Sequence, residues 1–160
     1  MERGHSLPRQ ASLPSGRKRG QPLFLDAVVC GEETDMDDFQ QAARRWLQDG
    51  ECLRRSDRRG GATHAYGLAA ECALKHAMDI IPGGERNLPS KHLPELVDNA
   101  KRWLHGRANS GLFQLLSRSD YMADWCIGNR YWADGQFTAT AVALHRDHAR
   151  RTCAATGLGI

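Results

Sequence analysis

Apolar residues recur every three to four positions over most of the chain, which is the spacing that predicts amphipathic helices. The first such segment spans residues 37–56, with apolar residues on one face and arginine, glutamine and aspartate on the other. The second spans residues 61–81 and carries an unbroken apolar stripe rich in alanine. We expect it to end at the Pro-Gly-Gly run at 82–84, because proline lacks the backbone donor and glycine accepts left-handed dihedral angles.

Three further helices are predicted downstream. Pro94 fits the first turn of a third helix, since proline is favoured at that position. Residues 112–126 predict a fourth helix, although the Ser-Arg-Ser-Asp run at 117–120 leaves two shorter pieces as an alternative. After a turn or irregular stretch at 128–135, residues 136–155 predict the last helix. No segment alternates with a period of two for more than a few residues, so the sequence predicts an all-α, up-and-down bundle of about five helices.

The N-terminal segment differs from the rest of the chain. Residues 1–35 are rich in proline, glycine, serine and arginine, and we expect a disordered basic arm there, followed by one helical domain over residues 36–160. Residues 1–22 hold five of the 22 basic and one of the 19 acidic residues, so the net charge of +3 becomes −1 for residues 23–160. The domain therefore lacks the overall basic charge typical of general nucleic-acid binding.

Composition also bears on the cellular compartment. No apolar run reaches the length of a membrane-spanning helix, and the first residues lack the apolar core of a secretory signal. The five cysteines are an odd number, widely spaced, without a Cys-x-x-Cys pair. We expect free thiols and a cytoplasmic location.

Three motifs, in this order, are similar to those of a known family. They are AYGLAAECALKH at 65–76, KHLPEL at 91–96 and WCIGNRY at 125–131. Together they resemble the HEPN (higher eukaryotes and prokaryotes nucleotide-binding) family, whose members carry a G-x-A-A-E-x-x-L-K-A helix, a following H-x-L-x-x-L and a later W-x-x-x-x-R-Y. The resemblance covers about residues 37–155.

The resemblance implies a helical bundle that is usually a symmetric homodimer, often with a nucleotidyltransferase-type protein partner or in defence and toxin–antitoxin systems. Many members resemble metal-independent ribonucleases with an Arg-x4–6-His motif, whose two residues meet at the dimer cleft. Arg130 lies near the expected arginine, but residues 134–137 include no histidine. Arg58 and Arg59 have that spacing to His64, which lies elsewhere in the chain than the family motif.

Glu71 and Lys75 are four residues apart on the second predicted helix, in the orientation of a favourable ion pair. One interpretation is a solvated or partly buried structural pair. The other depends on the resemblance and brings these two residues together with His92, Arg130 and Tyr131 in one polar cleft. There a carboxylate can orient an imidazole or hold an arginine for phosphate binding. On this interpretation the ligand-binding candidates are Glu71, Lys75, Arg130 and Tyr131, and the catalytic candidates are Arg130 and His92.

Aromatic residues surround the candidate arginine. Arg130 lies between Trp125 and the Tyr-Trp pair at 131–132, where it can stack and offer a planar fork to phosphate or carboxylate. The alternative is an arginine whose stem covers the end of the bundle. The four tryptophans are expected to fill the core or a dimer interface; they are Trp46, Trp103, Trp125 and Trp132.

No metal or other cofactor is predicted. His145 and His148 are three residues apart on the last predicted helix and could supply half of a metal site. Asp147, however, lies elsewhere on the helical wheel.

Three classes of function follow. The first is a HEPN-like domain, non-catalytic or degenerate, that binds a nucleotide, RNA or a partner protein, because an arginine cannot serve as a general base at neutral pH. The second is a metal-independent RNA endonuclease in which His92 or His64 replaces the family histidine and Arg130 stabilises negative charge on the phosphate. The third is a helical adaptor without a ligand, which would be favoured if the polar candidates were scattered over the surface.

Overall fold

The computed structural model describes residues 38–80, 90–107 and 110–159. Within these ranges the chain is all-α, as predicted, with five α-helices and three short 3-10 helices and no strand. The elements are α1 (Phe39–Arg55), α2 (Arg59–Asp79), α3 (Glu95–Trp103), η1 (His105–Arg107), α4 (Gly111–Leu116), η2 (Ile127–Tyr131), η3 (Asp134–Gln136) and α5 (Ala139–Ala155). The expected arm at 1–35, the domain start near Met36 and the glycine run at 82–84 lie outside the described residues.

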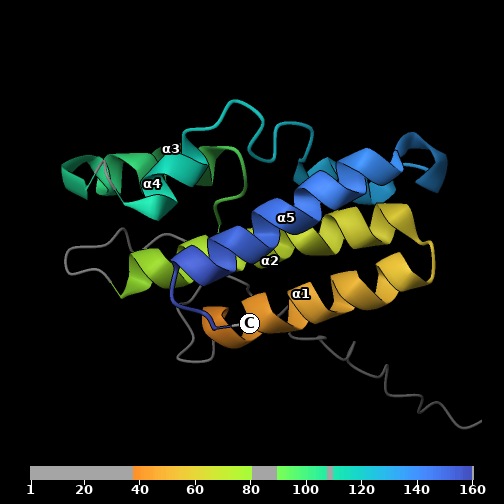
Figure 1. The fold of residues 1–160 in the computed structure, drawn as a ribbon, viewed down its shortest axis with the longest axis horizontal. Helices are drawn as coiled ribbons and strands as arrows, with labels where there is room; N and C mark the ends of the chain where they lie inside the picture. Colours follow the sequence, from red (N-terminus) through yellow and green to blue (C-terminus); the bar gives the residue numbers. More distant parts are fainter. Residues whose placement is uncertain (1–37, 81–89, 108–109, 160) are drawn as a thin grey trace, which may run out of the picture. The chain divides into compact units, whose positions relative to one another are not determined.

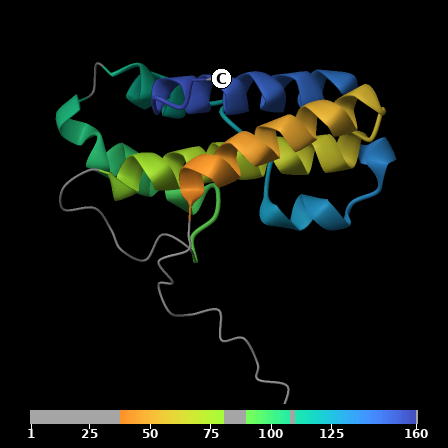
Figure 2. The same ribbon diagram turned by 90° about the horizontal axis from the view of Figure 1, so that it is seen from below.

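Helices α1, α2 and α5 lie side by side and form the main layer of the bundle (Figures 1 and 2). Helix α2 is buried along most of its length because its alanines let both neighbours approach closely. The shorter helix α3 packs against α2, and α4 packs against α3 and α5. Helix α2 therefore presents side chains to nearly every other element.

A distant residue caps the beginning of α2. The side chain of Arg58, which precedes the helix, makes no capping hydrogen bond. Instead, the backbone N–H of Gly60 donates to Oδ1 of Asp134 over 2.8 Å. The carboxylate satisfies a free donor at the positive end of the helix dipole, which fixes η3 against the start of α2.

The segment after α4 differs from the simplest prediction. Helix α4 ends at Leu116, so a single helix over 112–126 is wrong. The predicted break at 117–120 is confirmed, but the second piece of the alternative is not a helix. The following residues form turns in which Met122 adopts a left-handed backbone with φ of 49°. Helix α5 begins at Ala139 rather than at 136, because the Thr138 side chain accepts the N–H of Ala141 over 3.1 Å and caps the helix there.

The tryptophans do not all enter the core. Trp125 is buried, and Trp46 and Trp103 are partly buried against the core. Trp132 is 52% exposed, so it does not belong to the core of the chain, and the other alternative, a dimer interface, stays a prediction. It lies in the irregular stretch between η2 and η3, where no helical stripe directs it inward.

None of the described helices is long and apolar enough to cross a bilayer.

Candidate functional site

A buried ion pair lies at the centre of the site. Glu71 and Lys75 are one turn apart on α2, and Nζ of Lys75 donates to Oε1 of Glu71 over 2.8 Å. The two residues are only 2% and 4% exposed. The Lys75 ammonium also lies 5.8 Å from the ring centroid of Phe39 on α1. The predicted pair is thus present and is more deeply buried than either interpretation of the sequence required.

His92 approaches the same carboxylate from the loop that precedes α3. Its Nδ1 lies 3.0 Å from Oε1 and 3.1 Å from Oε2 of Glu71. Because a carboxylate only accepts hydrogen bonds, Nδ1 must be the donor, which leaves Nε2 to accept or donate elsewhere. The side chain is 44% exposed, so it joins the buried carboxylate to the surface.

His64 lies two turns before Glu71 on α2, on the same face of the helix. Its ring stacks on that of Trp125 at 6.0 Å between centroids. Burial lowers the pKa of His64, and the nearby Arg130 guanidinium lowers that pKa further, whereas Glu71 has a smaller, opposite effect. His64 is therefore neutral at pH 7.

Arg130 and Tyr131 belong to η2, which contacts α2. The Arg130 guanidinium lies 4.8 Å from the centroid of the Tyr131 ring, within the range of a cation–π contact. Both residues are exposed, Tyr131 to 78%. Within the part of the chain that the structure describes, Arg130 forms no ion pair. Its charge therefore remains open to an anionic ligand.

The structure brings the predicted site residues together in two groups. Glu71, Lys75 and His92 are joined by hydrogen bonds, and Arg130 contacts Tyr131. His64 lies within the electrostatic influence of both groups, since Arg130 lowers its pKa and Glu71 opposes that effect. From the sequence, His64 was predicted only as a substitute for the family's catalytic histidine. The sequence signal that places it in the site is its position seven residues before Glu71, which puts both residues on one face of the helix.

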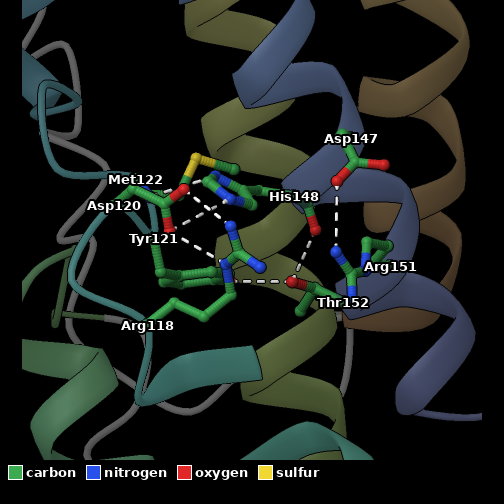
Figure 3. Close-up of polar contacts among 8 residues, drawn as sticks. All are labelled: Arg118, Asp120, Tyr121, Met122, Asp147, His148, Arg151 and Thr152. Atoms are coloured by element: carbon green, nitrogen blue, oxygen red, sulfur yellow. Dashed lines mark hydrogen bonds and ion pairs between the residues drawn. The ribbon is translucent and has the colours of Figure 1, made fainter. Parts of the chain in front are cut away.

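A second polar cluster lies between α5 and the turn after α4 (Figure 3). His148 is fully buried, and its Nδ1 accepts the backbone N–H of Met122 over 3.3 Å. Among the described residues its Nε2 has no hydrogen-bond partner, and it lies 4.0 Å from Oδ1 of Asp120. Beside it, the hydroxyl groups of Tyr121 and Thr152 share a 2.8 Å hydrogen bond. The hydrogen bond from Met122 to His148 can form only while Nδ1 of His148 is unprotonated.

The two buried histidines of α5, His145 and His148, predict acid sensitivity. Burial and the neighbouring His148 lower the pKa of His145, which is 2% exposed, from 6.5 to about 4. Between pH 6.5 and pH 4 the unfolded chain binds a proton at this histidine that the folded chain does not bind. The free energy of unfolding therefore has its full value above pH 6.5 and falls as the pH drops toward 4. One such group accounts for about 3 kcal/mol, and the lowered pKa of His148, caused mainly by burial, acts in the same direction.

The measurement is urea unfolding at several pH values between 7 and 4. We expect His145→Leu to flatten the decline in unfolding free energy, whereas His105→Gln, at an exposed position, should leave it unchanged. Equal slopes for wild type and His145→Leu would contradict the assignment.

Among the described residues, no group of three or more histidine, cysteine, aspartate or glutamate side chains could hold a metal ion. His145 and His148 both face the protein interior rather than a shared open position.

Comparison with protein-family models, with curated proteins and with solved structures gave no match to this chain.

Proposed function

We propose that this chain is a non-catalytic, HEPN-like helical domain that binds a nucleotide or RNA beside α2 and η2. The observation that carries the proposal is Arg130, an exposed guanidinium without an ion pair among the described residues, in cation–π contact with an exposed tyrosine; its charge also lowers the pKa of His64. Such a fork suits a phosphate group. The free face of Tyr131 suits a base, since aromatic side chains stack on bases without regard to sequence.

The burial of Glu71 also supports a site rather than a ligand-free adaptor. An adaptor predicts polar candidates scattered over the surface, whereas Glu71 and Lys75 are buried together and His92 is bonded to them. A buried carboxylate that orients a half-exposed imidazole is an arrangement suited to hydrogen bonding with a ligand at Nε2.

The test is binding of a single-stranded oligoribonucleotide, followed by fluorescence anisotropy at several salt concentrations. We expect Arg130→Ala to weaken binding about tenfold and to reduce the dependence on salt by about one phosphate contact. Arg44→Ala is the matched control, because Arg44 is also exposed but lies on α1, near the opposite end of α2 from η2. Equal losses for the two variants, or no binding by the wild type, would overturn the proposal.

The second candidate function is metal-independent RNA cleavage. The specific observation in its favour is a pair of histidines, His92 and His64, of which one is oriented by a carboxylate and the other is neutral beside Arg130. Either imidazole could take the proton of a 2′-hydroxyl while Arg130 stabilises charge on the phosphate.

Cleavage of cellular RNA in EDTA decides between the two functions. The non-catalytic proposal predicts no cleavage by folded protein. Cleavage that is lost in Arg130→Ala and in either His92→Ala or His64→Ala would replace it with the endonuclease.

The resemblance further supports a cytoplasmic homodimer, with a nucleotidyltransferase-type protein partner in a defence or toxin–antitoxin setting. Analytical ultracentrifugation tests the dimer directly, and a monomer at micromolar concentration would remove that part of the proposal.

A further inference from the structure

Trp125 joins the turn after α4 to the polar face of α2. It is buried, and its indole N–H donates to the backbone oxygen of Thr63 over 3.1 Å. Its ring lies nearly parallel to the imidazole of His64, with an interplanar angle of 15°. One side chain is thus fixed to the residue before His64 and covers His64 itself.

Gly67 provides the space for this ring. A Cβ atom at that position would lie 1.8 Å from Cε2 and 2.0 Å from Nε1 of Trp125. Real Cβ atoms do not approach other atoms so closely. The indole therefore rests directly on the backbone of α2, one turn after His64, and has little freedom to move.

The same turn also leads to the arginine of the site. The Asn129 side chain is buried in η2; its Nδ2 donates to the backbone oxygen of Asp124 over 2.8 Å. Its Oδ1 accepts from Sγ of Cys126 over 2.8 Å. Trp125 lies between Asp124 and Cys126, so these contacts fix the chain between Trp125 and Arg130. The indole thus covers the imidazole of His64, while the Asn129 contacts hold the start of η2 without using the indole.

One of the two ring nitrogens of His64 is enclosed by the protein. Nδ1 of His64 is buried and has no hydrogen-bond partner among the described residues, which leaves Nε2 as the atom able to contact a ligand. We propose that Trp125 is a positioning residue: seated over Gly67, it holds the His64 ring so that Nε2 serves the ligand site beside Arg130. This inference rests on the proposed function, because it takes His64 as part of that site.

The direct test is NMR of histidine side chains in the full chain, without ligand. In the wild type we expect contacts between the protons of the Trp125 indole and those of the His64 ring, together with a His64 pKa below 6.5. In Trp125→Leu the ring is uncovered and gains water, so the His64 pKa should rise toward 6.5. Trp125→Phe keeps an aromatic cover and should retain most of the lowering. The side-chain NMR signals of the exposed His105 are the internal control and should be the same in the wild type and in both variants.

Binding of the single-stranded oligoribonucleotide gives the second readout. If Trp125 acts through His64, Trp125→Leu weakens binding as much as His64→Ala does, and the double variant is no weaker than His64→Ala alone. Additive losses would overturn the inference, as would an unchanged His64 pKa in folded Trp125→Leu. If Trp125→Leu fails to fold, absence of the indole–imidazole contacts in the wild type still overturns the inference. Presence of those contacts, together with a lowered His64 pKa in Trp125→Phe, upholds the inference. Because the NMR readouts need no ligand, failure of the wild type to bind RNA would reject the proposed function and leave the positioning role to be judged by itself.

Discussion

Replacing Gly67 by alanine is expected to lower the free energy of unfolding by about 4 kcal/mol. The new methyl group would lie 1.8 Å from the indole of Trp125, so the ring must leave its place on α2. The move costs packing in the core and breaks the bond from the indole N–H to Thr63, leaving a buried donor without a partner. These losses outweigh the gain in helix propensity, which is at most about 1 kcal/mol for glycine to alanine.

The measurement is chemical denaturation followed by far-ultraviolet circular dichroism. Gly61→Ala is the matched control, since it lies on the same helix and its Cβ would lie 3.3 Å from the end of the flexible Leu53 side chain. We expect this control to change stability by less than about 1 kcal/mol. If Gly67→Ala behaves like Gly61→Ala, the indole does not rest on the helix backbone as described.

The long helices could be predicted because their burial leaves a periodic pattern in the sequence. The predicted ranges 37–56 and 61–81 agree with α1 and α2 to within two residues at each end. The turn after α4 could not be predicted in the same way, because distant contacts hold it. The N–H of Met122 donates to Nδ1 of His148, a residue 26 positions later, and this contact has no local signal.

The candidate site was predictable only in part, for a related reason. Glu71 and Lys75 are neighbours on one helix, so their pairing follows from spacing alone, whereas their complete burial depends on the elements packed around α2. The electrostatic effect of Arg130 on His64 joins residues 66 positions apart, and Arg130 lies in a 3-10 segment without periodicity. A pattern that repeats along one helix carries no information about which irregular segment will cover it.

Replacing Glu71 by alanine is expected to destabilise the fold by about 3–5 kcal/mol, the range for removing one partner of a buried ion pair. The Lys75 ammonium would lose the carboxylate 2.8 Å away and remain deep in the protein, where a charge is poorly solvated. His92 would lose the acceptor of its Nδ1–H, so its ring would no longer be held. Denaturant unfolding gives the stability, and the NMR line shape of His92 reports its orientation.

A double-mutant cycle separates the ion pair from simple loss of volume. Glu71→Leu combined with Lys75→Met removes both charges and keeps apolar bulk, so it should be more stable than Glu71→Leu alone. Glu95→Ala is the control for an exposed pair: Lys91 donates to Glu95 over 2.7 Å, but the glutamate side chain is largely exposed and the change should be small. A loss at Glu71 no larger than that at Glu95 would mean that the carboxylate is solvated in solution. His92 would then be hydrogen-bonded to a solvated carboxylate, and the proposal of an oriented imidazole beside α2 would be overturned.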